Sequence, residues 1–364
     1  MSSYQPLAPA IAADGSNPFV ARWADWRIDY TARAAYALPP GGVSLSNRAR
    51  ALWIFAHSFA TVLAKRAIRY EMIPNDRRNA GGFAFAGAAL RNMLGRSRSR
   101  VEPTDPAARA EVRRCLERYG IAVVTMPDNR MEALDRAAAP FFVALEEARR
   151  ASAEGRRAFG DSRGTTDRAR NAALYRLTEQ ILTEAGIMAA ASVHLARTPQ
   201  VVDINPQIND VTDDFWARVA DDTAGERLPD TAYFHRDASG GDLKAIIYCS
   251  DVGSENGPFE YVVGSQAMPI SRLDDWICEA NDHFLSDTRP EIRHLFASLP
   301  AWAQQKGTFG NDLVPEDALS KACLAQAWRI TAPRGSIVLF DTKGIHRGGM
   351  VEAGERRVLT CVLG

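Results

Sequence analysis

Cysteine is scarce in this sequence, and its spacing suggests no shared structural role. Five cysteines occur in 364 residues, and no two of them form a Cys-x-x-Cys pair. A disulfide framework or a structural zinc site is therefore not expected, and we predict a protein of the reducing cytoplasm. The stretch up to Pro18 also lacks the basic and long apolar segments of a signal peptide.

An excess of charge and a long apolar run are also missing. Lys plus Arg number 44 and Asp plus Glu number 44, so the formal net charge is zero. Nucleic acids and anionic membranes favour a basic excess, so we expect neither as the main partner. The most apolar run, residues 51–64, is shorter than the roughly 20 residues of a membrane span. It contains His57 and Ser58, and we predict a core helix.

The remaining composition is that of an ordinary globular protein, with 46% hydrophobic and 24% charged residues. Helical patterns come first, and short strand patterns crowd the C-terminal half. This order predicts an α+β fold in which helices brace an antiparallel β-structure. A two-sheet jelly roll suits the C-terminal half. We predict a mostly helical extension at 1–104, packed on a core domain at 105–364 that carries a helical insertion at about 271–324.

Apolar spacing and turn residues place the individual elements. A helix from Ser44 or Ser46 to about Tyr70 has its apolar face at Leu52, Phe55, Phe59, Val62 and Leu63. Pro140 is expected to kink or split a helix at 131–151, and Pro206 to break a strand at 201–209. The other expected helices lie at 111–119 and 167–185. The other expected strands lie at 121–125, 243–249, 259–263, 328–331, 336–340 and 358–363.

Two of the six histidines stand out, because each lies beside an expected strand. His235 precedes Asp237 by two residues, and residues i and i+2 of a strand share a face. Both can then reach one metal ion, with Arg236 turned away. His346 follows the apolar strand 335–340 and would complete a set of two histidines and one carboxylate. With open positions, that set is typical of non-haem Fe(II) oxygenases.

The other four histidines show no such context. We interpret them as surface residues or satisfied core residues. They are His57, His194, His283 and His294.

A pair of arginines, Arg356 and Arg357, follows His346. Arg357 lies eleven residues after His346, and a turn between them would bring a guanidinium back beside the metal. A planar guanidinium suits a bound dicarboxylate. Arg356 should then face the opposite way. The alternative is a surface ion pair with Glu352 or Glu355.

These motifs together resemble the phytanoyl-CoA dioxygenase family of Fe(II)- and 2-oxoglutarate-dependent oxygenases. The resemblance covers roughly residues 107–364, with 271–324 less matched. The stretches that carry it, in order, are 235–237, 243–244, 250–252, 255–265, 335–342, 346–349 and Arg357.

The resemblance implies a cupin-like double-stranded β-helix, the jelly roll expected above. It implies Fe(II) held by His235, Asp237 and His346, with 2-oxoglutarate and O2 as cosubstrates. Family members that halogenate carry a small residue at the carboxylate position. Asp237 therefore favours hydroxylation, desaturation or ring chemistry.

The resemblance also implies contacts to 2-oxoglutarate. Arg357 would hold the far carboxylate, Lys244 would point into the cosubstrate pocket, and Gln207 or Asn209 would line it. The family often has Ser or Thr two residues after the distal histidine, where this chain has Gly348. Lys244 or another donor must then replace that hydroxyl.

Three functions follow from this reading. The first is a cytoplasmic Fe(II)/2-oxoglutarate oxygenase that acts on a small organic metabolite and releases succinate and CO2. The second is a β-roll binding protein without turnover. The third is a cupin-type metalloenzyme that does not use 2-oxoglutarate and would not need Arg357. The substrate would be contacted by 74–106, 271–324 and loops near Trp216, and the sequence predicts neither its identity nor an oligomeric state.

Overall fold

The computed structural model describes most of the chain. The expected substrate contacts near Trp216 and at residues 74–81 and 95–106 fall outside the described part. The described residues are 5–7, 17–21, 44–68, 70, 73, 82–94, 107–151, 162–211, 230–237, 242–285, 295–304, 306 and 317–364.

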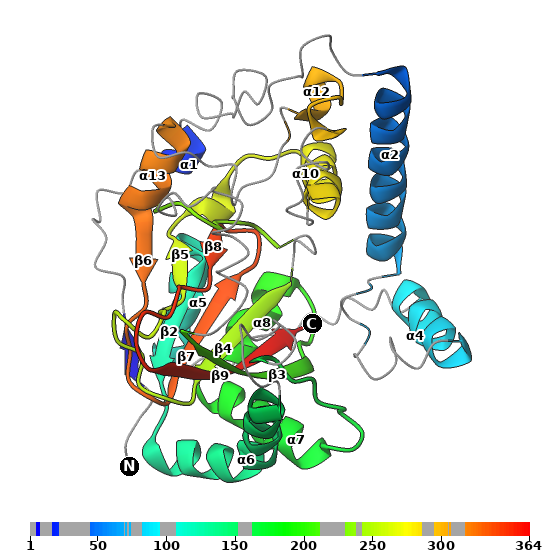
Figure 1. Cartoon of the computed structure of the whole chain (residues 1–364). Coiled ribbons are helices and arrows are strands. Elements are labelled where there is room, and N and C mark those ends of the chain that lie inside the picture. Colours follow the sequence, from blue (N-terminus) through cyan, green and yellow to red (C-terminus); the bar gives the residue numbers. More distant parts are fainter. Residues whose placement is uncertain are drawn as a thin grey trace.

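Two antiparallel sheets, built mainly from strands of the C-terminal half, face each other (Figure 1). The large sheet has the strand order β1-β2-β7-β4-β9-β3 and the small sheet the order β6-β5-β8. Their strands are β1 (Gln5–Leu7), β2 (Ile121–Thr125), β3 (Val201–Asp210), β4 (Leu243–Tyr248), β5 (Glu260–Val262), β6 (Ala327–Arg329), β7 (Ser336–Asp341), β8 (His346–Arg347) and β9 (Glu355–Leu363).

From β3 onward the chain passes back and forth between the two sheets. β3, β4, β7 and β9 lie in the large sheet. Between them the chain visits the small sheet at His235, which forms a bridge to β8, then at β5 and β6, and then at β8. This path is a double-stranded β-helix, so the predicted α+β jelly roll is confirmed. β2 and β1 extend the large sheet beyond β7.

The space between the sheets, here called the roll interior, holds one apolar cluster. Val338 and Phe340 enter it from the large sheet, and Phe259 and Tyr261 enter it from the small sheet. Alternate residues of each large-sheet strand face the other way, where Leu339 and Leu359 join a second cluster with the helices. A residue's position along a strand therefore decides whether it faces the interior or the helices.

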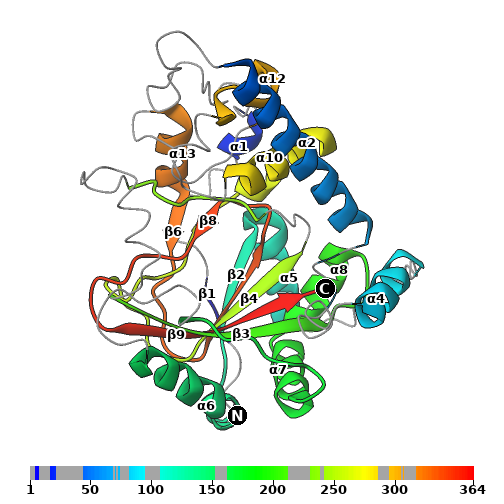
Figure 2. The ribbon, with the colours of Figure 1, turned by 45° about the vertical axis from the view of Figure 1, so that its right-hand side comes forward.

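Four helices cover the outer face of the large sheet (Figure 2). Of the two expected effects of Pro140, a kink or a split, the split does not occur, because Pro140 lies inside the continuous helix α6. Its ring is exposed, while Ala138 and Phe142 on either side are buried. Packing of that face outweighs the local penalty of proline. The four helices are α5 (Ala107–Tyr119), α6 (Asp128–Ala151), α7 (Ala172–Glu184) and α8 (Ile187–Leu195).

A second correction concerns Pro206, which does not break its strand. β3 runs without interruption from Val201 to Asp210 at the edge of the large sheet. The carbonyl of Pro206 points away from β9 and accepts a hydrogen bond of 2.8 Å from the amide of Gly164. Its nitrogen faces the same way, so the missing N–H costs no bond to β9.

The predicted N-terminal helix exists as α2 (Leu45–Ala67), capped by the Ser44 side chain. Phe55 is buried, whereas Leu52 is 46% exposed. The partner of α2 is α10 (Arg272–Leu285) of the expected insertion, and their apolar cluster contains no strand residue among those described. The domain boundary at 104/105 stays a prediction, because residues 95–106 lie outside the described part.

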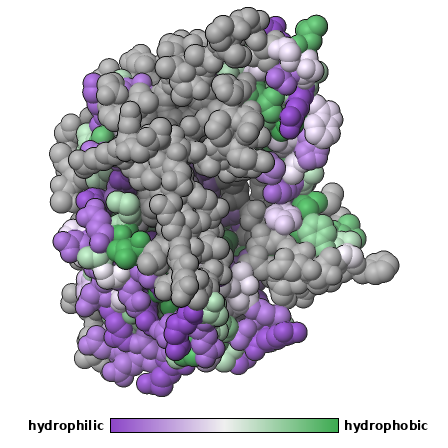
Figure 3. Space-filling model, in the orientation of Figure 1, coloured by the Kyte–Doolittle hydropathy of each residue, from purple (hydrophilic) through white to green (hydrophobic). Residues whose placement is uncertain are grey.

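The other elements are short or peripheral. Figure 3 shows hydrophobic side chains over α4 and the top of α2, and a mainly hydrophilic surface over α6 and α7. None of the helices in the described residues is long and apolar enough to cross a membrane. The remaining elements are α1 (Pro18–Ala21), α4 (Gly82–Leu94), η6 (Ser265–Ala267), α12 (Ala301–Gln304) and α13 (Ala318–Gln326).

Candidate metal centre

Two histidines lie side by side where the chain enters the small sheet. The amide of His235 donates to the carbonyl of His346 at 3.0 Å, and the reverse bond is 2.8 Å. The residue before each histidine, Phe234 or Ile345, is completely buried in one apolar cluster. Because neighbouring residues in extended chain face opposite sides, both imidazoles point toward the roll interior, where the His346 ring lies 5.0 Å from that of Phe340.

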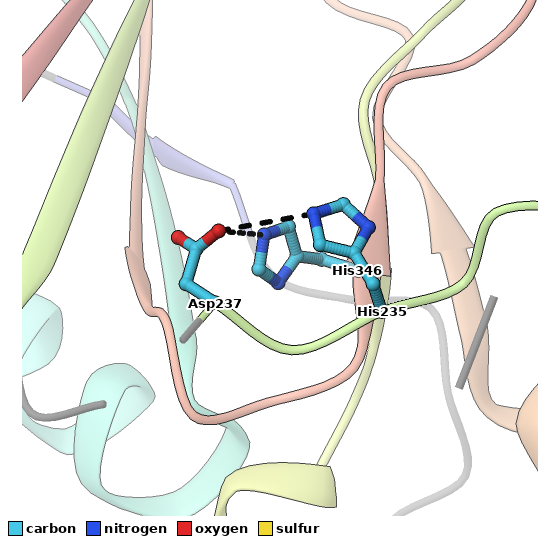
Figure 4. Close-up of side chains that lie close together, drawn as sticks. All are labelled: His235, Asp237 and His346. Atoms are coloured by element: carbon cyan, nitrogen blue, oxygen red, sulfur yellow. Dashed lines mark ion pairs between the residues drawn. The ribbon is translucent and has the colours of Figure 1, made fainter. Parts of the chain in front are cut away.

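The carboxylate of Asp237 completes the site. Its Oδ1 lies 3.8 Å from Nε2 of His235 and 3.7 Å from Nε2 of His346. The three donor atoms all lie within 4.8 Å of one another. Figure 4 shows both imidazoles directed toward the same carboxylate oxygen. The structure thus brings together the three residues that the sequence singled out.

Backbone carbonyls orient both imidazoles. Nδ1 of His235 lies 2.9 Å from the Tyr233 carbonyl, and Nδ1 of His346 lies 2.8 Å from the Gly344 carbonyl. A carbonyl only accepts, so each Nδ1 carries the proton and each Nε2 keeps its lone pair. Two imidazole nitrogens and one carboxylate oxygen therefore face one point. This donor set fits a divalent transition metal with open positions.

Gly344 has a steric role beside this carbonyl contact. A Cβ on Gly344 would overlap the hydroxyl of Tyr261, which itself donates to the Asp341 carbonyl at 3.0 Å. The turn that carries the His346 contact therefore requires glycine.

Lys244 places a positive charge next to the carboxylate of Asp237. Its Nζ lies 2.6 Å from Oδ2 of Asp237, which leaves Oδ1 toward the imidazoles. Burial alone would raise the pKa of Asp237, but the Lys244 ammonium holds that pKa well below its usual value. Burial, together with His346, lowers the pKa of His235 to about 4. At neutral pH an ionised carboxylate thus faces a neutral His235 imidazole, the protonation state that binds a cation.

Each histidine is followed by an arginine that contacts the segment of the other. Arg236 follows His235, and its Nε donates to the Lys343 carbonyl at 2.6 Å. Arg347 follows His346, and its Nη1 donates to the Ala232 carbonyl at 2.9 Å. We call Arg236 and Arg347 the arginine clamp. The arginine clamp was not predicted, although the His-Arg dipeptide that occurs at both 235–236 and 346–347 was its signal in the sequence.

Arg357 points away from His235, Asp237 and His346 in the structure. On β9, Val358 faces the roll interior and Leu359 faces the helices. Alternation therefore turns Arg357 toward the helices, where Nη1 lies 2.7 Å from Glu146 of α6 and Nε 2.5 Å from Glu355. A surface ion pair with Glu352 or Glu355 was the alternative role considered for Arg357 from the sequence, and the structure shows the pair with Glu355.

Arg356 is the arginine that faces inward, against expectation. It is buried, and Nη2 donates to Oδ1 of Asn209 at 3.3 Å. A Cβ on Gly348 would lie 3.4 Å from the same nitrogen. The guanidinium therefore reaches the segment that follows His346.

The other predicted pocket residues share this inward face. Gln207 pairs with Val358 and Asn209 with Arg356 across β3 and β9, and directly opposed residues of neighbouring strands lie on one face. Nε2 of Gln207 donates to Oγ1 of Thr360 at 3.0 Å. The inward face of the large sheet is thus polar at these positions and carries the cations of Lys244 and Arg356.

The three other histidines that the structure describes lie apart from the candidate metal centre. His194 pairs with Asp341 at 3.1 Å. His57 and His283 are exposed, and the His57 ring stacks on Trp53. His294 lies outside the described residues.

Comparison with known proteins gives structural matches only. No family model matches the sequence, and no curated protein matches it. One similar solved structure is the epimerase SnoN with Fe3+, alpha ketoglutarate and nogalamycin RO, at 15% identity and a TM-score of 0.39, covering 71% of this chain and 84% of that one. A second is apo EctD from S. alaskensis, at 12% identity and a TM-score of 0.42, covering 72% and 79%. A third is HygX from Streptomyces hygroscopicus with nickel and 2-oxoglutarate, at 14% identity and a TM-score of 0.36, covering 70% and 86%.

Proposed function

We propose that this chain is a non-haem Fe(II)- and 2-oxoglutarate-dependent oxygenase that oxidises a small organic molecule, with succinate and CO2 as coproducts. The observation that carries the proposal is the convergence of His235, Asp237 and His346 on one point at the roll interior. Three protein ligands leave three positions of an octahedral ion open. Two suit a chelating 2-oxo acid and one suits O2.

The metal ligands have distinct roles in this proposal. His235 and His346 would supply neutral nitrogen donors whose orientation their carbonyl partners fix. Asp237 would supply one oxygen, while Lys244 keeps the carboxylate ionised and occupies the other oxygen. When bound, iron with 2-oxoglutarate supplies the activation of O2 for oxidation of a substrate C–H bond. With Asp237 in place, no ligand position is left for a halide, so hydroxylation or desaturation is the proposed outcome.

Arg356 replaces Arg357 as the proposed anchor of the far carboxylate of 2-oxoglutarate. It is buried on the inward face, next to the segment after His346. A bidentate guanidinium–carboxylate contact fits a dicarboxylate of fixed length. Gln207 and Asn209, which lie on the same face, would line this end of the pocket. Gly348 leaves open the space where the family often has a hydroxyl.

The phytanoyl-CoA dioxygenase family is the proposed relationship within this class. It is supported by the order of the motifs from His235 to the arginine pair. The proposed cellular setting is a reducing cytoplasm, and it is supported by the low number of cysteines, no two of which form a Cys-x-x-Cys pair.

Succinate release tests the proposed function. The full chain is loaded anaerobically with Fe(II), mixed with 2-oxoglutarate and then exposed to air, with and without candidate metabolites. We expect O2-dependent succinate formation that a metabolite accelerates and that His346→Ala abolishes. Metal binding without any decarboxylation of 2-oxoglutarate would favour a cupin-type enzyme or a binding protein instead.

A further inference from the structure

An ion-pair network links α2 to the metal centre. In α2, Nε and Nη2 of Arg66 donate to the two carboxylate oxygens of Glu279 at 2.7 and 2.5 Å. Nη2 of Arg66 also lies 2.9 Å from Oδ2 of Asp275, and the other oxygen of Asp275 accepts from Nη2 of Arg236 at 3.0 Å. Asp275 thus bridges a guanidinium of α2 and one of the arginine clamp.

The network is largely shielded from water, with only the Arg66 side chain as much as 28% exposed, and burial raises the pKa of Glu279 to about 7. The side chains of Arg236 and Asp275 are 10% and 17% exposed, and that of Glu279 is 5% exposed. Two guanidinium groups face two carboxylates. Removing one member of such a shielded set leaves a partner charge without compensation, so the four groups hold one another in place.

The far end of the network lies within the metal centre itself. Arg236 stands between His235 and Asp237, and its Nε holds the Lys343 carbonyl in the segment that leads to His346. The Arg236 side chain is therefore held on one side by the segment that leads to His346 and on the other side by Asp275. Any movement of α10 that displaces Asp275 also releases one contact of the guanidinium that joins the two histidine segments.

We propose that Asp275 is a positioning residue of the metal centre, through which the docking of α2 onto α10 stabilises the segment of metal ligands. This inference rests on the proposed function, because it requires that His235, Asp237 and His346 hold a metal. With Asp275 and Arg66 in place, the ligands are held near their bound geometry before the metal arrives. Without these two side chains, the ligand segment must become ordered as the metal binds, and the free-energy cost of this ordering weakens metal binding.

The test is a Co(II) titration of the full, metal-free chain, followed by the visible absorption of bound Co(II). Asp275→Asn and Arg66→Gln should each lower the Co(II) affinity about tenfold or more, as expected for groups that hold metal ligands in place. The matched control is Asp274→Asn. Asp274 lies in the same turn of α10 but pairs with Lys306, so its loss should leave the affinity within about twofold of wild type. Arg66→Gln combined with Asp275→Asn should bind no more weakly than Asp275→Asn alone, because both act through one contact.

The outcomes separate the two proposals. Co(II) that binds wild type and His346→Ala alike overturns the metal centre and this inference with it. Co(II) that binds the wild-type site but loses no affinity in Asp275→Asn overturns the inference alone, as does an equal loss in Asp274→Asn. If Asp275→Asn does not fold, Arg66→Gln decides, because Arg66 is partly exposed and its replacement leaves the clamp intact.

Discussion

The guanidinium carbon of Arg347 lies 4.4 Å from the ring centroid of Phe234, so the residue after one metal-site histidine packs on the residue before the other. Arg347 also pairs with the buried carboxylate of Glu260 at 2.8 Å. Arg347→Met keeps the aliphatic part of the side chain but removes the positive charge that pairs with the buried carboxylate of Glu260. We expect a loss of about 3 kcal/mol in the free energy of unfolding, measured by urea denaturation of the metal-free chain.

Arg329 supplies the control for this experiment. It pairs with Glu260 at 3.2 Å, but its side chain is 53% exposed. Arg329→Met should therefore cost less than about 1 kcal/mol. If the two variants lost the same free energy of unfolding, the prediction that Arg347 is the more important partner of Glu260 would be wrong.

Metal binding should stabilise the fold through His346. At a Mn(II) concentration of about 100 times Kd, linkage adds about 2.7 kcal/mol to the free energy of unfolding. His346→Ala should remove this gain, whereas His194→Ala, which changes a histidine paired with Asp341, should retain it. Thermal unfolding with and without Mn(II) measures both. A metal-induced shift that survives in His346→Ala would refute the site.

Arg356 and Arg357 should differ in their effect on 2-oxoglutarate. A charge-assisted bidentate contact contributes roughly 1.5–3 kcal/mol, so Arg356→Ala should raise the 2-oxoglutarate requirement about ten- to a hundredfold. Arg357→Ala removes a partly exposed pair with Glu146 and Glu355 and should leave the requirement nearly unchanged. Titration of 2-oxoglutarate in the succinate assay measures both. The reverse order would restore the original assignment of Arg357.

Lys244 should control the pH dependence of metal binding. Its ammonium holds the pKa of Asp237 low, so Lys244→Met should raise that pKa. As the pH falls, protons then compete with the metal for Asp237 in the variant earlier than in wild type. We expect the Co(II) affinity of Lys244→Met to fall more steeply between pH 7.5 and pH 5.5. Parallel pH profiles would show that Lys244 does not act on Asp237.

Phe55 and Leu52 should contribute unequally to the docking of α2. Phe55 is buried against α10 and lies edge-on to Trp302, and Phe55→Ala should cost about 3–5 kcal/mol. Leu52, on the same predicted apolar face, is 46% exposed, so Leu52→Ala should cost well under that. Chemical denaturation, or hydrogen exchange over α2, measures the difference. If both variants lost a similar amount of stability, α2 would pack on α10 through a different face.

The convergence of His235, Asp237 and His346 was predictable because local features determine it. The spacing of His235 and Asp237 and the apolar strand before His346 are visible in the sequence. The error at Arg356 and Arg357 has a simple origin. Side chains alternate with a period of two, so a difference of one residue in the connection at 348–354 exchanges inward and outward positions. The alternation of Val358 and Leu359 alone could not show which of them faces the interior.

Other features depend on contacts between distant parts of the chain. Pro206 was expected to break its strand, and Pro140 was expected to kink or split its helix. The edge position of β3 and the exposed ring in α6 make both prolines tolerable, and neither fact is local. The bridge from Arg66 through Asp275 to Arg236 joins three segments far apart in sequence. No periodicity marks such a bridge, so only the folded arrangement shows it.

The pairing of α2 with α10 has a consequence for synthesis of the chain. α2 ends at Ala67, and α10 begins at Arg272, so about two hundred residues must be translated before its partner emerges. At roughly 5–20 residues per second this takes about ten to forty seconds. During that interval the nascent helix presents Phe55 and its apolar neighbours without α10 to cover them. The nascent chain therefore exposes an incomplete hydrophobic surface until α10 has been synthesised, which makes α2 a natural site for a chaperone to engage.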